Sequence, residues 1–413
     1  MTAQRSKFGV GFSDSANSLN AGKLAAEAAL NQAGLSPEKV QLCFLFCTSR
    51  HDPAEFFAGV KFVLGEKTKF FGGFANGTCD NLSLGYDGYE TVVGVWGDST
   101  ARFDLFVQEG IAFNEYETGK ALGAQIVANE YPEGAQMILL FDAVNRLEGK
   151  FRMNYGTPFI KGMNETIGQL PNTIGARMLG DMRFKPTYQW YDQTMTQNAA
   201  MALVMSGDIQ IDYQIMHGCE PVSAYHTVTA VKGATILELD HRPALDVIIG
   251  ILGEDLAEKP QEVKFFVTLG KNTGDKWERY NPGSYINRMC VGIDQQNRGL
   301  HMAEMDLEPG MEIQLMRRSF DMEYVEIRTR KIMQKVKAKK RRIIFGFYIN
   351  CSGRAAAYSN QTDEDIRYVQ AGINGEFPLM GIYEAGELAP IGGALQVLDW
   401  SGVLCLFSEP ITE

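Results

Sequence analysis

Three short stretches of the chain place a lone charged side chain in a glycine-rich context. Asp181 follows Gly180, Glu387 follows Gly386, and Arg354 ends the stretch CSGR. A glycine in a strand lets another backbone or a ligand approach closely. A carboxylate at Asp181 or Glu387 could hold an ammonium group, and Arg354 could clamp a carboxylate through two parallel hydrogen bonds. Together these side chains would suit an amino-acid zwitterion.

The same residues also have a purely structural interpretation. A Gly-Asp or Gly-Glu pair at the end of a strand commonly forms a turn in which the carboxylate caps backbone N–H groups. The sequence leaves both interpretations open for Asp181, Glu387 and Arg354.

Cys351 is a candidate nucleophile, because Arg354 follows three residues later and could lower the pKa of its thiol. The alternative is a small buried thiol at the end of a strand. The five histidines lie far off in sequence, so we expect no catalytic residue. The chain also has no HxH or HExxH motif, P-loop or dinucleotide fingerprint, so we expect neither a metal nor a cofactor.

Composition narrows the class of protein. The chain has 413 residues, of which 45% are hydrophobic and 22% charged, and a net charge of −11. This charge argues against general binding to nucleic acid or to an anionic membrane. The seven cysteines are scattered without a CxxC pair, which favours reduced, buried thiols. With no apolar signal core at the N-terminus and no long apolar stretch, we expect a cytoplasmic protein.

One local exception to the acidic charge is the run RTRKIMQKVKAKKRR at residues 328–342. Its apolar residues keep helical spacing, so we interpret it as the solvated face of a packed helix. The alternative is a surface for an acidic partner protein or for nucleic acid.

The charged residues must be positioned by strands, and the order of strands and helices repeats. Helix-like segments at 21–33 and 118–130 each precede a nearly continuous apolar run, VQLCFLFCT and MILLFD, which is typical of strands covered on both faces. A short helix, a glycine-broken strand and two further strands follow in each copy. We therefore infer repeated α-β-α-β-β units at 8–110 and 118–217, and a fainter third unit at 322–413.

Residues 221–318 interrupt this order with short alternating strands and one helix at 244–252. We interpret this segment as a β-rich α+β insertion in the C-terminal half. The predicted fold is α/β with layered sheets, and the predicted domains are 1–217 and 218–413.

Four stretches resemble the FIST family, the F-box and intracellular signal transduction proteins. They are PNTIGARMLGDMRFKPTYQW, HGCEPVSAYHTVTAVKGATILELDHRPALDVI, INCSGRAAAYS and PLMGIYEAGELAPIGG. They occur in the family's order, so the two domains are similar to its FIST N and FIST C domains. The resemblance implies a sensory domain for amino acids or related small ligands. Its motifs carry the ligand-binding candidates Gly180, Asp181, Cys351, Arg354, Tyr383, Gly386 and Glu387.

We therefore predict a stand-alone sensor that binds a small molecule between its two halves and signals to a partner protein. Selection of a closed arrangement of the halves would be the mechanism. The alternatives are a thiol-dependent or hydrolytic enzyme that uses Cys351, and a protein-interaction scaffold without ligand.

Overall fold

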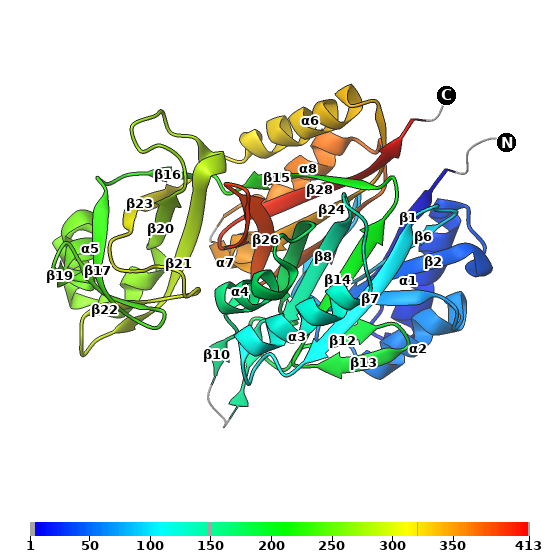
Figure 1. Ribbon diagram of the computed structural model, residues 1–413, viewed down its shortest axis with the longest axis horizontal. Helices are drawn as coiled ribbons and strands as arrows, with labels where there is room; N and C mark the ends of the chain where they lie inside the picture. The colour runs from blue at the N-terminus through cyan, green and yellow to red at the C-terminus, as the bar shows by residue number, and fades with distance from the viewer. Residues whose placement is uncertain (1–4, 148–150, 320, 360, 412–413) are drawn as a thin grey trace.

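The computed structural model describes residues 5–147, 151–319, 321–359 and 361–411 (Figure 1). The predicted α/β fold is confirmed. Three six-stranded sheets with flanking helices form the main body, and a separate β-rich lobe lies at one side of it.

Three consecutive segments of the main body share one order of elements: strand, helix, strand, helix, strand, hairpin, strand. The first segment has β1 (Lys7–Ser13), α1 (Ser18–Ala33), β2 (Val40–Cys47), α2 (Pro53–Leu64), β3 (Lys69–Phe74), β4 (Gly77–Cys79), β5 (Leu84–Tyr86) and β6 (Thr91–Gly97). The second has β7 (Arg102–Glu109), α3 (Glu115–Ala128), β8 (Gln136–Asp142), α4 (Gly156–Ile167), β11 (Asn172–Met178), β12 (Tyr188–Tyr191), β13 (Thr194–Gln197) and β14 (Ala199–Ser206). The third has β15 (Gln210–Met216), α6 (Glu323–Ala338), β24 (Arg341–Cys351), α7 (Ala356–Ser359), α8 (Asp365–Ile373), β25 (Leu379–Glu384), β26 (Gly386–Ile391), β27 (Ala394–Leu398) and β28 (Gly402–Pro410). A small extra pair, β9 (Val144–Asn145) and β10 (Arg152–Met153), lies between β8 and α4.

Each hairpin leaves its own segment and extends the sheet of another. The first sheet has the order β1-β6-β2-β3 and continues with β12-β13 of the second segment. In the same way β26-β27 of the third segment extends the second sheet, and β4-β5 of the first segment extends the third. The three segments are therefore tied into a closed ring, and the two halves of the chain share sheets.

The core of the main body lies where the three sheets face one another. One face of each sheet is covered by its own helices, in three separate apolar clusters. The opposite faces meet in one large shared cluster that includes Phe44, Ile138 and Phe347 from the second strand of each segment. Burial on both faces explains why these strands read as nearly continuous apolar runs in the sequence.

Glycines allow the paired helices of a segment to pack very closely. A Cβ atom on Gly119 of α3 would lie 2.1 Å from the carbonyl oxygen of Phe159 on α4, and one on Gly59 of α2 would lie 2.1 Å from that of Leu19 on α1. Both helix pairs therefore require a residue without a side chain at the crossing point. Across the described residues, none of the helices combines the length and the apolar character needed to cross a membrane.

The inserted lobe covers residues 219–318 and lies between β15 and α6. It consists of β16 (Cys219–Pro221), β17 (His226–Lys232), β18 (Thr235–Leu239), β19 (Arg242–Pro243), α5 (Ala244–Leu252), β20 (Thr268–Asn272), β21 (Tyr285–Asp294), β22 (Gly299–Met302) and β23 (Glu312–Arg318). The lobe has its own apolar core around α5. In Figure 1 it stands beside the main body, and β21 lies on the side of the lobe that faces the main body.

Candidate functional site

The shared core turns polar at one end of the sheets. Side chains alternate along a strand, so the residue two positions after an inward apolar side chain also points inward. Beyond the apolar positions of β2, β8 and β24, the next inward residues are Thr48, Asp142 and Cys351. The three segments thus place a hydroxyl, a carboxyl and a thiol at equivalent positions around the same end of the core.

The exchanged hairpins add a second set of polar side chains to this end. The first strand of each hairpin carries one of them at its second position: Thr78 in β4, Gln189 in β12 and Glu387 in β26. Their partners on the neighbouring strands are Ile382, Gly73 and Ala176, respectively. Glu384 ends β25. We call the seven residues Thr48, Thr78, Asp142, Gln189, Cys351, Glu384 and Glu387 the polar layer; each of them is at most 3% exposed.

Glu387 is the most unusual member of the polar layer. Its carboxyl group is fully buried, and neither carboxyl oxygen has a hydrogen-bond partner on another described residue. Burial raises the pKa of Glu387 well above its ordinary value, and the charge of Asp399 raises it further, whereas Arg354, Arg177 and its own backbone N–H oppose the rise. A buried carboxyl with unused oxygens is costly, and it is most easily explained by a polar partner that the protein itself does not supply.

Two further carboxyl groups lie near Glu387. Glu384 Oε2 accepts a hydrogen bond of 2.5 Å from the backbone N–H of Leu179, while its Oε1 has no partner within the described chain. Burial raises the pKa of Glu384 well above its ordinary value, and the charges of Glu387 and Asp142 add to the rise. Burial also raises the pKa of Asp142 to about 7, although the backbone N–H groups of Val144 and Asn198 donate to its carboxyl. Without a cation beside them, these carboxyl groups are therefore shifted toward their neutral, protonated form.

Arg177 of β11 lies directly behind the polar layer and is fully buried. Its Nη2 is 2.8 Å from Asp399 Oδ1, and its Nη1 is 3.5 Å from Glu304 Oε2. A Cβ atom on residue 386 would lie 2.7 Å from Nη2, so Gly386 leaves the space that the guanidinium occupies. Its Nε has no hydrogen-bond partner among the residues that the structure describes.

The inserted lobe closes this end of the main body through Glu304. The Glu304 carboxylate accepts hydrogen bonds from the N–H groups of Gly156 (2.9 Å) and Thr157 (3.2 Å), at the N-terminus of α4. The positive end of the helix favours a negative charge there. The backbone N–H of Met289 also donates to Asp399 Oδ2 at 3.2 Å. The lobe thus shares one buried ionic network with Arg177 and Asp399, directly behind the polar layer.

The sequence-predicted residues fall into three groups. Cys351, Gly386 and Glu387 lie in or beside the polar layer. Arg354 and Tyr383 are buried next to it but are already engaged: Arg354 Nε and Nη2 contact Asp365 Oδ2 at 3.0 and 2.8 Å, and Tyr383 donates to Glu364 Oε2 at 3.2 Å. Arg354 Nη1 also donates to the carbonyl oxygen of His217 at 3.0 Å.

Asp181 and Gly180 belong to a turn beside the layer. Asp181 Oδ2 accepts a hydrogen bond of 2.7 Å from the Ser49 hydroxyl, and its Oδ1 accepts one of 2.9 Å from the Arg183 N–H. The Gly180 carbonyl accepts from the Ser49 N–H. These contacts correspond to the turn-capping interpretation of the Gly-Asp pair.

Sequence reasoning missed Arg177, Asp399, Glu304, Glu384 and Asp142. A signal existed for two of them: Arg177 interrupts the apolar run NTIGARM, and Asp142 ends the run MILLFD. Within the described residues, no three His, Cys, Asp or Glu side chains are grouped so that they could hold a metal ion.

The thiols should be inert in the folded protein. All seven cysteines are described, free and buried, and burial together with the nearby charge of Glu387 raises the pKa of Cys351 to about 12. We expect a thiol reagent such as dithiobis-nitrobenzoate to react with Cys351 at least ~100-fold more slowly in native than in denaturant-unfolded protein. Rapid native labelling, mapped to Cys351 by mass spectrometry, would instead support the thiol-dependent enzyme.

Comparisons with known proteins agree on a family. The FIST N domain model matches residues 41–242, and the FIST C domain model matches residues 244–390. An uncharacterized protein of Mycobacterium tuberculosis (strain H37Rv) is 23% identical over 243 residues, and one of Mycobacterium bovis is 22% identical over 243 residues. Each of these alignments covers 58% of this chain and 62% of the relative, so the match spans less than two thirds of the relatives' length.

Solved structures give only weak likenesses. A cyanuric acid hydrolase from A. caulinodans matches with a TM-score of 0.29 and 10% identity, over 49% of this chain and 71% of its own. A second cyanuric acid hydrolase structure matches with a TM-score of 0.30 and 8% identity, over 76% of this chain and 100% of its own. Likenesses this weak carry no argument about this chain.

Proposed function

Because the FIST N and FIST C domains together cover residues 41–242 and 244–390, the chain belongs to the FIST family, and we propose that it is a sensor that binds a small ligand in the polar layer. FIST domains are associated with sensing in signal transduction. The observation that carries the proposal is the fully buried Glu387 carboxyl, whose two oxygens have no hydrogen-bond partner on another described residue.

The chemistry of the layer selects a ligand rich in N–H donors. Glu387 and the free Oε1 of Glu384 both offer acceptors, and an ammonium group would lower the pKa of each by its charge. An amino acid fits this description, because its carboxylate could accept from the unused Nε–H of Arg177. Arg354 is a weaker candidate for that role, since both arms of its guanidinium already bind Asp365 and His217.

Binding in a closed interior requires the protein to open, and the inserted lobe is the element that we expect to move. Its Glu304 belongs to the network with Arg177 and Asp399 directly behind the layer, which a bound ion pair would rearrange. A ligand that binds more tightly when the lobe is in one of its positions shifts the population of molecules toward that position. The altered surface would then be recognised by a signalling partner protein. The seven free thiols favour a reducing compartment such as the cytoplasm.

The thiol-dependent enzyme has less support. Cys351 has a raised rather than a lowered pKa, and the buried His217 is engaged by the Pro282 carbonyl and the Cys219 N–H. The scaffold without ligand remains an outcome of the experiment below.

Glu387→Gln should separate ligand binding from folding. We expect one or more amino acids or small amines to stabilise the wild-type protein in a thermal-shift screen, by about 2.7 kcal/mol at a hundred times Kd. Glu387→Gln should lose this response by tenfold or more in affinity, because a neutral amide attracts an ammonium group far less.

The matched control is Glu262→Gln, which changes an exposed glutamate of the lobe that forms an ion pair with Lys259. It should respond like the wild type. If no amine or amino acid shifts the wild-type melting temperature, or if Glu387→Gln keeps the full response, a polar-layer ligand site is wrong and the scaffold becomes the better hypothesis.

A further inference from the structure

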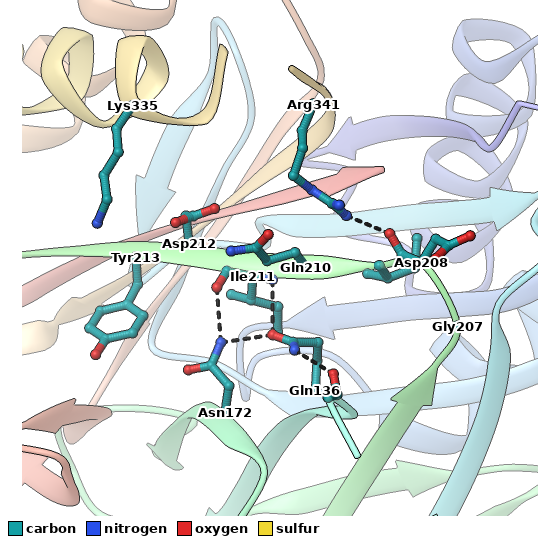
Figure 2. A pocket seen from close by; sticks show the side chains of 12 residues that line it. Gln136, Asn172, Gly207, Asp208, Gln210, Ile211, Asp212, Tyr213, Lys335 and Arg341 are labelled. Carbon is teal, nitrogen blue, oxygen red and sulfur yellow. Dashed lines mark hydrogen bonds between the residues drawn. The ribbon is translucent and has the colours of Figure 1, made fainter. Parts of the chain in front are cut away.

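A cavity lies at the opposite end of the sheets from the polar layer. It has a volume of about 710 Å³ and lies along β15, at the amino ends of β8 and β11 (Figure 2). Gln136 of the cavity and Asp142 of the polar layer are the first and last residues of β8, so roughly 20 Å of strand separates the two. Both halves of the chain line it, since Asn172 comes from the first half and Lys335 and Arg341 from the second.

Strand β15 divides the cavity lining into two faces. Figure 2 shows Gln210 and Asp212 on the face toward α6 and β24, with Tyr213 on the other face. Asp212 is only 6% exposed; its Oδ1 is 2.6 Å from Lys339 Nζ, while its Oδ2 has no hydrogen-bond partner within residues that are described. This half-satisfied, nearly buried carboxylate offers a place for a ligand donor.

Two cations reach the same face of β15 as Asp212. Lys335 extends from α6 toward the strand, and Arg341 extends from the start of β24 (Figure 2). The Lys335 ammonium forms no hydrogen bond or ion pair with any described residue. Arg341 holds the carbonyl oxygens of Ser408 and Asp208 through Nη2 and the Ser408 hydroxyl through Nε, so its charge is placed by the fold. The carboxylates of Asp212, Asp208 and Glu409 lie near enough to favour this charge, but within the described residues none of them forms an ion pair with Arg341.

The balance of charges defines the ligand. Two carboxylates, Asp208 and Asp212, and two cations, Lys335 and Arg341, line the cavity, and Lys339 adds a third cation by pairing with Asp212. Among the described residues neither lining cation forms an ion pair with a carboxylate, so both can attract an anion. A carboxylate or phosphate group is the natural partner for such a pair. The Asp212 Oδ2 atom and the Gln210 amide beside them require hydrogen-bonding groups on the same molecule. The polar lining on both faces of β15 would give an apolar ligand little contact area to bury.

We propose that this cavity is a second ligand site, which takes a small organic anion bearing a hydroxyl group, such as a hydroxy acid or a sugar phosphate. The anionic group lies between Lys335 and Arg341, and the hydroxyl donates to Asp212 Oδ2. The site is independent of the polar layer, so a sensor with this geometry responds to an anion at one end and to an amine at the other.

Calorimetric titration at low ionic strength tests the proposal with L-malate and glycerol 3-phosphate as probes. We expect at least one probe to bind with a Kd of about 1 mM or tighter, and the better probe distinguishes a carboxylate from a phosphate site. Succinate, which lacks only the hydroxyl of malate, should bind more weakly than malate because nothing then donates to Asp212. Lys335→Met should weaken the better probe by about tenfold.

Lys331→Met is the matched control, because Lys331 is exposed on the same helix one turn earlier and does not line the cavity. It should bind the probes as the wild type does, as should Glu387→Gln at the polar layer. The proposal fails if neither probe binds at about 10 mM, or if Lys335→Met binds as tightly as Lys331→Met. Loss of probe binding in Glu387→Gln would show instead that the two sites are one.

Discussion

Arg177→Met should lower the free energy of unfolding by about 3–5 kcal/mol, measured by urea denaturation. Methionine fills a similar volume but leaves two buried carboxylates, Asp399 and Glu304, without their cation. It also leaves the carbonyl oxygens of Ala303 and Ala385 without their guanidinium donor. Breaking a buried ion pair by removing one partner is costly because the other charge stays desolvated.

The control for this effect is Arg317→Met, since Arg317 and its partner Glu220 are both more than half exposed. Exposed ion pairs contribute about 0–1 kcal/mol, so this variant should be close to the wild type. A second variant, Arg177→Met with Asp399→Asn, should recover part of the loss because it removes one of the stranded charges. If Arg177→Met costs less than about 1 kcal/mol, the network does not hold the lobe on the main body.

Local patterns in the sequence predicted much of the fold, because they depend on nearby residues alone. The helix expected at 244–252 is α5, Ala244–Leu252. The apolar runs at 40–48 and 137–141 are strands covered on both faces. The exchange of hairpins could not be predicted, because an edge strand such as β4 pairs through backbone groups that look alike in every sheet.

In the candidate site, too, local sequence patterns were predictable and contacts between distant parts of the chain were not. Glu387 was found because a carboxylate follows a glycine in a strand, but the function of that glycine is to make room for Arg177, which lies 209 positions earlier in the chain. The fork of Arg354 suggested a ligand clamp, and its role as one stays a prediction. Its nearest carboxylate is Asp365, on α8, which a sequence pattern could not place.

The polar layer contains several buried ionisable groups at positions where apolar side chains would make the folded state more stable. A folded protein tolerates such a cost where the groups serve binding or switching. Their titration also makes the cost measurable, because a carboxyl that is harder to ionise when folded changes stability with pH.

Asp142 should make the protein less stable as the pH rises toward 7. Its pKa is about 7 in the folded state against the ordinary 3.8, so between these values the folded state keeps a proton that the unfolded state releases. The contribution of Asp142 to the free energy of unfolding is therefore fully present below about pH 4 and is lost as the pH rises through 7. Between about pH 5 and pH 8 the loss amounts to about 3 kcal/mol.

The measurement is the difference in unfolding free energy between the wild type and Asp142→Asn at each pH, by urea denaturation. The difference is needed because other groups titrate in the same range: the pKa of buried His217 is lowered to about 4 and that of His51 is lowered too, which stabilises the fold as the pH rises. Asn cannot ionise, so the wild type should lose stability relative to it from about pH 5 to pH 8. A flat difference would mean that Asp142 is already ionised in the folded protein and that the layer is more polar than its burial indicates.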